Sequence, residues 1–269
     1  MELIINERPV RVAPGTSLAA LKREFSPRAD VVILNGHQVD EHHSLEDGDR
    51  VVFIIKGVIP EMDELEGLMA ARHTPGVHGR MKEAVVGIAG LGGLGSSVAV
   101  ALARMGVGRL ILADHDVVEP SNLNRQQYFV EQIGRKKAEA MEEILQRVNP
   151  FCRVEAHVAH LDERNIPVIF SGVGILVEAF DRAEAKAMLI DTVLKEMPGV
   201  TVVAASGLAG YESSNSIRTM EAADGLYMVG DLEAEALSGR GLMAARVGIA
   251  AHHQANAVVR LLMDEDPSA

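Results

Sequence analysis

The sequence predicts an α/β protein: a doubly wound, Rossmann-like, mostly parallel sheet that follows a small α+β domain. The chain has 269 residues, 48% of them hydrophobic, which is enough to build a small core and a larger one. From residue 84 onward, continuous apolar strands alternate with helices, as in parallel sheets covered on both faces. The first 58 residues instead follow the order strand, strand, helix, strand, strand.

Residues 1–58 are predicted to form the small domain. Thr16 or Ser17 can cap its helix, and Asn35–Gly36 is a hairpin signal. This order of elements in so few residues is typical of the β-grasp, or ubiquitin-like, fold; another small α+β fold is the alternative. The predicted elements are two short strands within residues 2–12, a helix within 13–25, a strand within 30–39 and a last strand within 45–57.

Residues 59–83 are predicted to be a linker with a short helix over 61–72, and residues 84–269 to form the large domain. A glycine-rich segment with the acidic stretch 231–236 is a candidate cover for its active site. The elements of this domain are predicted as strands within 84–90, 109–114, 152–158, 174–180 and 200–206, and helices within 95–106, 134–150, 182–199 and 241–263.

Charge and composition exclude several classes of protein. The formal net charge is -12, which disfavours binding to the phosphate backbone of nucleic acids. No apolar run approaches the length of a membrane span, and charges interrupt the N-terminus where a signal peptide is apolar. We therefore expect a cytoplasmic protein that binds neither nucleic acid nor membrane. The single cysteine, Cys152, excludes an intrachain disulfide and an all-cysteine zinc site.

A glycine-rich turn follows the first strand of the large domain. Gly90, Gly92 and Gly95 fit G-x-G-x-x-G, and Asp114 ends the next strand. Such a turn presents backbone N–H groups and the positive end of a helix to phosphate, while the acid accepts hydrogen bonds from ribose hydroxyls. The pattern suits NAD, FAD, S-adenosylmethionine and ATP alike, and a tight turn without a ligand is the alternative.

Basic residues after this turn favour chemistry at phosphorus. Arg125 and Lys137 could surround the phosphates, which a dehydrogenase does not require but attack at phosphorus does. Asp181 follows the fourth parallel strand, where an acid can hold Mg²⁺ between phosphates. The alternatives are a solvated basic face for Lys137 and a helix N-cap for Asp181.

Four segments resemble, in order and spacing, the superfamily of ThiF, MoeB and ubiquitin-activating enzymes, and most closely a ThiF-type sulfur carrier protein adenylyltransferase. They are GLGGLG at 90–95, DHDVVEPSNLNRQ at 114–126, GRKK at 134–137 and AFDRAEAK at 179–186. The N-terminal domain resembles the sulfur carrier ThiS. The resemblance implies that ATP and Mg²⁺ are used to adenylate the C-terminal glycine of a ubiquitin-like carrier, with release of pyrophosphate.

The resemblance also implies roles for individual residues. Arg125 and Lys137 would neutralise phosphate charge, Asp181 would hold the metal, and Arg72 would reach the ATP of a neighbouring subunit. The residues expected to contact the nucleotide are Gly90, Gly92, Gly93, Asp114, Ser121, Asn122, Leu123, Asn124, Arg125, Gln126, Lys137, Asp181 and Arg182.

The chain departs from its relatives at several points. Arg182 stands where they commonly have Asn, and the Cys-x-x-Cys pairs that hold zinc in many of them are absent, so no zinc is expected. No cysteine follows Cys152, which we interpret as structural. The reaction should therefore stop at the adenylate, and a separate sulfur donor, such as a cysteine desulfurase, should act next.

The fused β-grasp domain does not end in Gly-Gly, because the chain continues through Lys56–Gly57. We expect the substrate to be a separate carrier that does end in Gly-Gly, in the thiamine thiazole pathway by resemblance, and the enzyme to be a homodimer. Three alternatives stay open. They are a catalytically weak pseudo-enzyme scaffold with the fused domain docked, an NAD-dependent oxidoreductase, and a relative that adenylates a carboxylate on tRNA.

Overall fold

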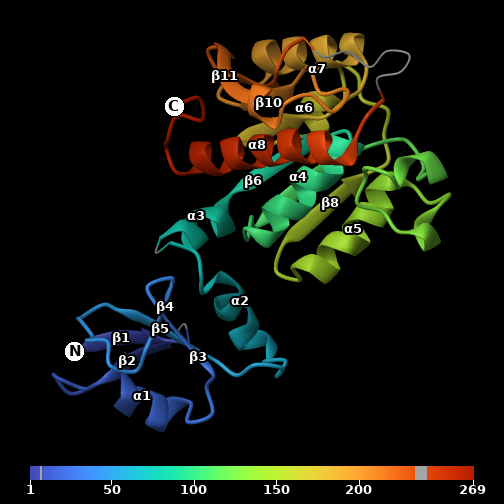
Figure 1. Cartoon of the computed structure of the whole chain (residues 1–269). Helices are drawn as coiled ribbons and strands as arrows, with labels where there is room; N and C mark the ends of the chain where they lie inside the picture. The colour runs from blue at the N-terminus through green and yellow to red at the C-terminus, as the bar shows by residue number, and fades with distance from the viewer. Residues whose placement is uncertain (7, 75, 234–240) are drawn as a thin grey trace. The chain divides into compact units, whose positions relative to one another are not determined.

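The computed structural model of the chain describes residues 1–6, 8–74, 76–233 and 241–269. It divides into two compact units, Met1–His78 and Gly79–Ala269 (Figure 1). Glu7, Pro75 and the end of the predicted acidic stretch, residues 234–236, lie outside the described residues. Within the described residues, no helix combines the length and apolar character needed to span a bilayer.

The first unit has the β-grasp architecture that the sequence predicts. Its five-stranded sheet has the order β2-β1-β5-β3-β4, in which β1 and β5 are parallel and the other pairs antiparallel. The strand β4 is an addition to the prediction, and the Asn35–Gly36 turn joins it to β3. The strands are β1 (Glu2–Ile5), β2 (Arg8–Arg11), β3 (Val31–Leu34), β4 (His37–Val39) and β5 (Arg50–Ile54).

Helices pack on both faces of this sheet. Helix α1 (Leu18–Phe25), which the Ser17 side chain caps, closes one core through Leu18 and Leu21. On the other face, Ile33 and Val52 form a second cluster with Ala71, which directly follows α2 (Met62–Ala70). The predicted linker helix is therefore part of the first unit's fold.

The second unit contains a seven-stranded sheet with the order β11-β12-β10-β9-β6-β7-β8, parallel except for β11. The doubly wound fold predicted from the sequence is confirmed. The strands are β6 (Val85–Ala89), β7 (Arg109–Ala113), β8 (Arg153–His157), β9 (Ile175–Glu178), β10 (Thr201–Ala205), β11 (Arg218–Ala223) and β12 (Leu226–Gly230). The helices are α3 (Val77–Glu83), which begins at the unit boundary, α4 (Gly93–Arg104), α5 (Lys137–Val148), α6 (Ile166–Ile169), α7 (Ala183–Glu196) and α8 (Ala244–Leu262).

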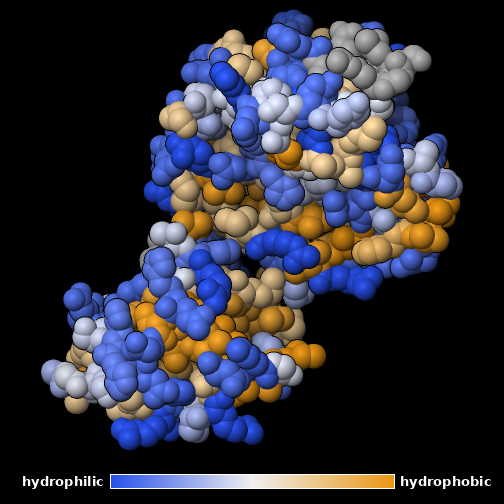
Figure 2. Space-filling view, in the orientation of Figure 1, coloured by the Kyte–Doolittle hydropathy of each residue, from blue (hydrophilic) through white to orange (hydrophobic). Residues whose placement is uncertain are grey.

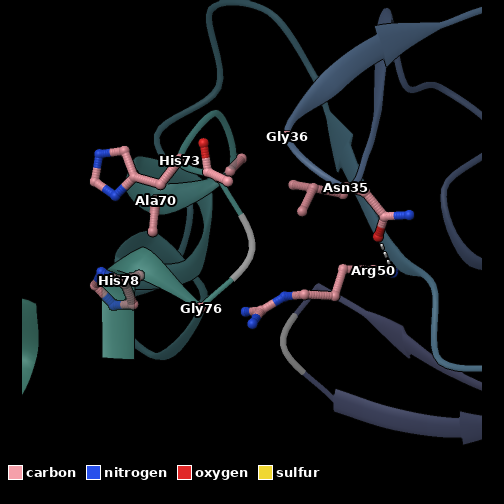
Figure 3. A pocket seen from close by; sticks show the side chains of 10 residues that line it. Asn35, Gly36, Arg50, Ala70, His73, Gly76 and His78 are labelled. Atoms are coloured by element: carbon pink, nitrogen blue, oxygen red, sulfur yellow. Dashed lines mark hydrogen bonds between the residues drawn. The ribbon is translucent and has the colours of Figure 1, made fainter. Parts of the chain in front are cut away.

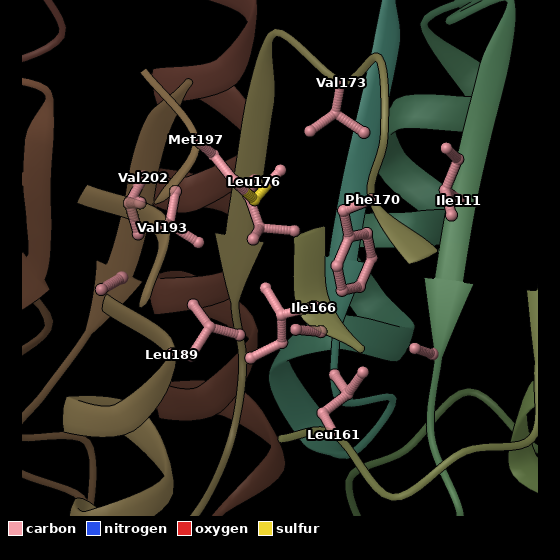
Figure 4. Close-up of a cluster of buried hydrophobic side chains, with 13 residues drawn as sticks. Ile111, Leu161, Ile166, Phe170, Val173, Leu176, Leu189, Val193, Met197 and Val202 are labelled. Atoms are coloured by element: carbon pink, nitrogen blue, oxygen red, sulfur yellow. The ribbon is translucent and has the colours of Figure 1, made fainter. Parts of the chain in front are cut away.

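Helices cover the sheet in two groups. Helix α4 contacts α5 and α8, and α8 runs across α4 in Figure 1. Helices α6 and α7 contact each other and close a core that includes Phe170 and Leu176 (Figure 4). Gly87 in β6 makes this packing possible, because a Cβ there would lie 2.6 Å from Leu176 Cδ1 and 2.8 Å from Phe170 Cδ1. Because all strands of this sheet except β11 run in the same direction, their carboxyl ends lie at one edge of the sheet.

Candidate active site

The glycine-rich turn joins the end of β6 to the start of α4. A Cβ at Gly95 would lie 1.9 Å from the Gly90 carbonyl oxygen, so only glycine lets the helix pack directly on the turn. The helix begins after Gly92, which provides no side-chain cap. The first N–H groups of a helix have no partner within it, so this end of α4 offers donors to an anion.

Asp114, the acid after β7, holds the turn in place. Its Oδ2 accepts the Leu91 N–H at 2.7 Å, and its Oδ1 accepts the Asp116 N–H at 2.8 Å. The residue is buried. Each carboxylate oxygen has a second lone pair, so Asp114 can still accept hydrogen bonds from ribose hydroxyls.

The loop that contains Ser121 to Gln126 folds over the same turn. It begins with a 3-10 helix, Pro120–Asn122, and the Asn122 Oδ1 accepts the Glu119 N–H at 3.0 Å. Arg125 lies against the turn, because a Cβ at Gly93 would be 3.4 Å from Arg125 Cγ. Its Nη1 donates to the Asn124 side chain at 2.8 Å and to the Ser121 carbonyl at 3.2 Å. The loop thus fixes the guanidinium next to the start of α4.

Gln126 is the site residue with an unsatisfied polar atom. It is 8% exposed, and its Oε1 has no hydrogen-bond partner in the described structure. Its Nε2 would be 3.9 Å from a Cβ at Gly92, so the amide lies beside the glycine turn. A buried acceptor without a partner is costly, and a ligand hydroxyl or amine would satisfy it.

Lys137, the first residue of α5, is buried and reaches Asp116. The Lys137 Nζ lies 2.8 Å from Asp116 Oδ2, and the backbone N–H of Lys137 donates to the Asp116 carbonyl oxygen at 3.0 Å. Partial burial would raise the pKa of the Asp116 carboxyl, but the hydrogen bond and charge of Lys137 outweigh this effect, and the pKa is lowered. Lys137 therefore has a charged partner, Asp116, at the N-terminal end of α5.

Tyr128 connects this lysine to the glycine turn. Its hydroxyl lies 2.9 Å from the Leu91 carbonyl oxygen and 3.4 Å from that of Lys137. Burial, together with the charges of Asp114 and Asp116, raises the pKa of Tyr128, so it remains a donor. The turn, Asp114, Arg125, Gln126 and Lys137 are thus brought together.

Asp181 and Arg182 lie in the bend between β9 and α7. The bend packs against the glycine turn: a Cβ added to Gly90 would lie 2.9 Å from the Ala179 carbonyl oxygen. Both side chains are exposed. In the described part of the chain, the Asp181 carboxylate has neither a hydrogen bond nor an ion pair. The ion pair of Arg182 there is a long one, with 3.9 Å between its Nε and Glu184 Oε2.

Arg72 belongs to the first unit, where its Nη2 donates to Gln38 Oε1 at 3.2 Å. Its expected role at the nucleotide of a neighbouring subunit stays a prediction. The same unit has a pocket between the β3–β4 turn and the rings of His73 and His78 (Figure 3). The two ring centroids are 6.0 Å apart, and burial, followed by the charge of His78, lowers the pKa of His73.

The residues of the second unit fit ATP and Mg²⁺. The free helix N–H groups and two nearby cations suit phosphates, and the unpartnered Gln126 oxygen suits a polar ligand. The exposed Asp181 carboxylate is the hard oxygen ligand that Mg²⁺ prefers. Asp114, His115 and Asp116 also place ligand atoms within 4.8 Å of one another. Both carboxylates of this group are already engaged: Asp114 accepts two backbone N–H groups, and Asp116 pairs with Lys137.

Comparison with known families identifies this fold. The sequence matches the ThiF family over residues 69–269, more than half of the chain. The chain belongs to the ThiF family. Residues 1–57 match the ThiS-like ubiquitin family. Both resemblances predicted from the sequence motifs are thereby confirmed.

Several proteins are similar to this ThiF family member. The "Adenylyltransferase and sulfurtransferase UBA4" of Eremothecium gossypii is 35% identical over 156 residues, which cover 57% of this chain and 34% of that protein. The "SAMP-activating enzyme E1" of Haloferax volcanii is 36% identical over 118 residues, which cover 44% of each chain. The matched segments thus span less than half the length of these relatives.

Solved structures support the fold alone, because their sequence identity is low. The E. coli tRNA N6-threonylcarbamoyladenosine dehydratase TcdA in complex with ATP has a TM-score of 0.68 and 23% identity, covering 77% of this chain and 97% of that one. E. coli MccB with AMPCPP and MccA has a TM-score of 0.57 and 22% identity, covering 78% and 73%.

Three residues at or near the candidate site were missed by the sequence reasoning: Asp116, Tyr128 and Glu178. Asp116 and Tyr128 stand within or beside the quoted motifs, and the Asp-x-Asp pattern was a usable signal for the first. Glu178, the buried last residue of β9, pairs with Lys186 eight positions later. An acid at the end of an apolar strand, followed by a lysine at that spacing, would have been the signal for this pair.

Proposed function

We propose that this chain is an ATP-dependent adenylyltransferase that activates the C-terminal glycine carboxylate of a ubiquitin-like sulfur carrier. The observation that carries the proposal is the pair of cations at the glycine turn: Arg125 against Gly93, and buried Lys137 beside Asp116. Two cations at a free helix N-terminus suit a triphosphate that is to be cleaved. The names of the curated relatives support the same class of reaction.

In the proposed reaction, a carboxylate oxygen of the carrier bonds to the α-phosphorus of ATP. The bond from that phosphorus to the bridging oxygen breaks, and pyrophosphate leaves with the electron pair. Arg125 and Lys137 stabilise the charge that grows on the leaving oxygens. Mg²⁺, when bound, would add positive charge at the phosphates, and Asp181 is the residue that would hold it. Asp114 binds the ribose.

The rest of the loop completes the proposed nucleotide site. Gly90, Gly92 and Gly93 leave room for the phosphates, and Arg182 lies beside Asp181 at the start of α7. The loop residues that would enclose the nucleotide are Ser121, Asn122, Leu123, Asn124 and Gln126.

The proposed reaction stops at the acyl-adenylate. Cys152 is the only cysteine of the chain, and it is buried. Burial raises its pKa to about 11, despite an opposing hydrogen bond with the Leu110 backbone, so the thiol stays protonated near neutral pH. Transfer of sulfur to the adenylate would therefore need a separate donor. By resemblance, the thiazole branch of thiamine synthesis is the pathway that we propose.

The fused β-grasp unit is proposed to be a resident domain and not the substrate. Its last strand ends at Ile54, and the chain continues into α2, which packs on the sheet through the cluster of Ile33, Val52 and Ala71. An adenylated carrier needs a free C-terminal carboxylate, which this domain lacks. The substrate is then a second protein that ends in Gly-Gly.

We also propose that the enzyme is a homodimer. Four apolar side chains in the segment between β7 and α5 are exposed: Val117, Phe129, Val130 and Ile133. Figure 2 shows apolar surface on this side of the second unit, where Figure 1 draws the green loops that precede α5. Clustered exposed apolar groups favour association. In a dimer, Arg72 of one subunit could serve the site of the other.

Carrier-dependent ATP–pyrophosphate exchange tests the proposed function. We expect exchange only when a carrier ending in Gly-Gly is present, and its near-abolition by Lys137→Ala or Asp181→Ala. Lys136→Ala is the matched control, because among the described residues the Lys136 Nζ donates to the His115 carbonyl oxygen and to no side chain. Exchange at the full rate in both site variants, or preferential binding of NAD over ATP, would contradict the proposal.

A further inference from the structure

A buried ion pair lies beneath the bend that carries Asp181. Glu178 precedes the bend as the last residue of β9 and has no exposed surface, whereas Lys186 follows it in the first turns of α7. Lys186 Nζ lies 3.0 Å from both carboxylate oxygens of Glu178. The pair therefore closes the bend between the strand and the helix.

The same carboxylate also holds the backbone on either side. Its Oε1 accepts the Phe180 N–H at 2.7 Å, one residue before Asp181, and its Oε2 accepts the Ala205 N–H of β10 at 3.4 Å. The Glu178 carbonyl accepts Gln254 Nε2 of α8 at 2.9 Å. One residue thus connects the bend to the strands and to two helices.

Asp181 has no such support of its own. Within the described residues, its exposed carboxylate has no partner, so no contact fixes the side chain and the range of positions open to it depends on the backbone that carries it. The bonds to Phe180 and Lys186 fix that backbone from both ends.

Stability alone does not account for a charged pair at this position. Burial raises the pKa of the Glu178 carboxyl more than Lys186 and the two backbone donors lower it, so the charge is held there at a cost. Apolar or neutral residues of similar volume in place of a buried ion pair are often as stable or more so. A directional pair does, however, define the geometry of the bend.

We propose that Glu178 and Lys186 are positioning residues that set the Asp181 carboxylate for the metal–nucleotide complex. This inference rests on the proposed function, in which Asp181 holds Mg²⁺. Neither residue is proposed to touch the nucleotide. They act through the backbone of residues 179–182.

The test compares Lys186→Met, Lys186→Arg and the double variant Glu178→Gln, Lys186→Met, which removes both charges and keeps an oxygen for the Phe180 N–H. Lys195→Met is the matched control, because this lysine lies on the same helix and pairs with Asp191 at 3.0 Å, but is exposed. Asp181→Ala is the reference for loss of the metal ligand. Two quantities are measured as the concentration of free Mg²⁺ is varied: the affinity for ATP, and the rate of carrier-dependent exchange.

We expect the double variant to melt close to the wild-type temperature, because it leaves no buried charge unpaired, and Lys186→Met to melt lower, because Glu178 loses its partner. The folded protein of both variants should need more Mg²⁺ for half-maximal exchange and lose about tenfold or more in kcat, since small misplacements of a positioned group are costly. Lys186→Arg should retain most of the activity, and Lys195→Met all of it. A merely structural role would instead leave the Mg²⁺ dependence of exchange unchanged in the folded protein of both variants.

Two further outcomes separate the inference from the function on which it rests. A folded double variant with wild-type rate and Mg²⁺ dependence, alongside an inactive Asp181→Ala, would overturn the inference alone. If the wild type binds MgATP but exchanges with no carrier, the proposed function fails. The Mg²⁺-dependent part of ATP affinity then decides the inference: its loss in the double variant supports it, and its retention overturns it.

Discussion

Two lysine–carboxylate pairs lie near the carboxyl ends of the parallel strands, and they are built in opposite ways. In the Lys137–Asp116 pair, at 2.8 Å, the lysine side chain is 8% exposed and the aspartate 51%. In the Lys186–Glu178 pair, at 3.0 Å, the lysine is 21% exposed and the glutamate 0%. The first pair buries its cation and the second buries its anion.

The buried member of each pair indicates its role. A buried lysine with a half-exposed partner can exchange that partner for a phosphate, because water and ions reach Asp116 easily. A buried glutamate surrounded by Lys186 and two backbone N–H groups cannot exchange anything without leaving a charge unpaired. The first pair suits a ligand-binding group, and the second suits a fixed part of the scaffold.

The largest expected difference between the pairs is in stability. Glu178→Ala should lower the free energy of unfolding of the second unit by about 3–5 kcal/mol, because it breaks a buried pair and leaves backbone donors unsatisfied. Asp116→Ala should cost less, about 1–3 kcal/mol, because it takes the ion-pair partner from the buried Lys137 ammonium but water can reach the half-exposed position of the lost carboxylate. Urea unfolding followed by circular dichroism measures both. Equal losses would show that exposure does not distinguish the two pairs.

The next difference is in catalysis at the Lys137–Asp116 pair. Lys137→Met should reduce carrier-dependent exchange about 100-fold or more, since it removes a cation from the transition state. Asp116→Asn should reduce exchange by less than about tenfold, because asparagine can still accept a hydrogen bond from the ammonium group. Steady-state kcat and KM for ATP measure the effect. A loss with Asp116→Asn as large as that with Lys137→Met would make Asp116 part of the reacting machinery.

The sequence predicted those parts of the fold whose signal is periodic. Continuous apolar strands followed by helices identified β6, β7, β9 and β10, whose residues are almost all buried, together with the edge strand β8 and the helices α4, α5 and α7. The four-residue helix α6 was not predicted. The β11–β12 hairpin was missed. Strand β11 is mostly exposed at the edge of the sheet, so it has no apolar pattern to detect. The three-residue strand β4 was also too short to be separated from the hairpin signal.

The site was predicted to a similar extent. Arg125 and Lys137 stand in motifs at recognisable spacing. In the structure Arg125 lies against Gly93, and the Tyr128 hydroxyl links the Lys137 backbone to the Leu91 carbonyl of the glycine turn. The pairing of Asp116 with Lys137 joins residues that are 21 positions apart, so it depends on how the loops fold back and has no local signal. Glu178 stands in the sequence as the acid at the end of an apolar strand. Its contacts with Phe180, Lys186 and Ala205 are seen only in the folded chain.

The smallest expected effects distinguish the pairs by the sign of their pH dependence. The folded-state pKa of Asp116 is lowered, so its contribution to stability is present above the ordinary aspartate value and is lost as the pH falls below about 4. The stability difference between wild type and Asp116→Asn should therefore shrink on acidification, by less than about 1 kcal/mol in total because the Asp116 carboxylate is half exposed.

Glu178 should behave in the opposite way. Its folded-state pKa is raised, mainly by burial, so its contribution is fully present below the ordinary glutamate value and is lost as the pH rises through the folded-state pKa. The stability difference between wild type and Glu178→Gln should hence decrease as the pH rises from about 4 toward neutrality. Urea unfolding of both variants at several pH values gives the two slopes. Slopes of the same sign would mean that the two carboxylates are equally solvated, and the contrast between the pairs would fail.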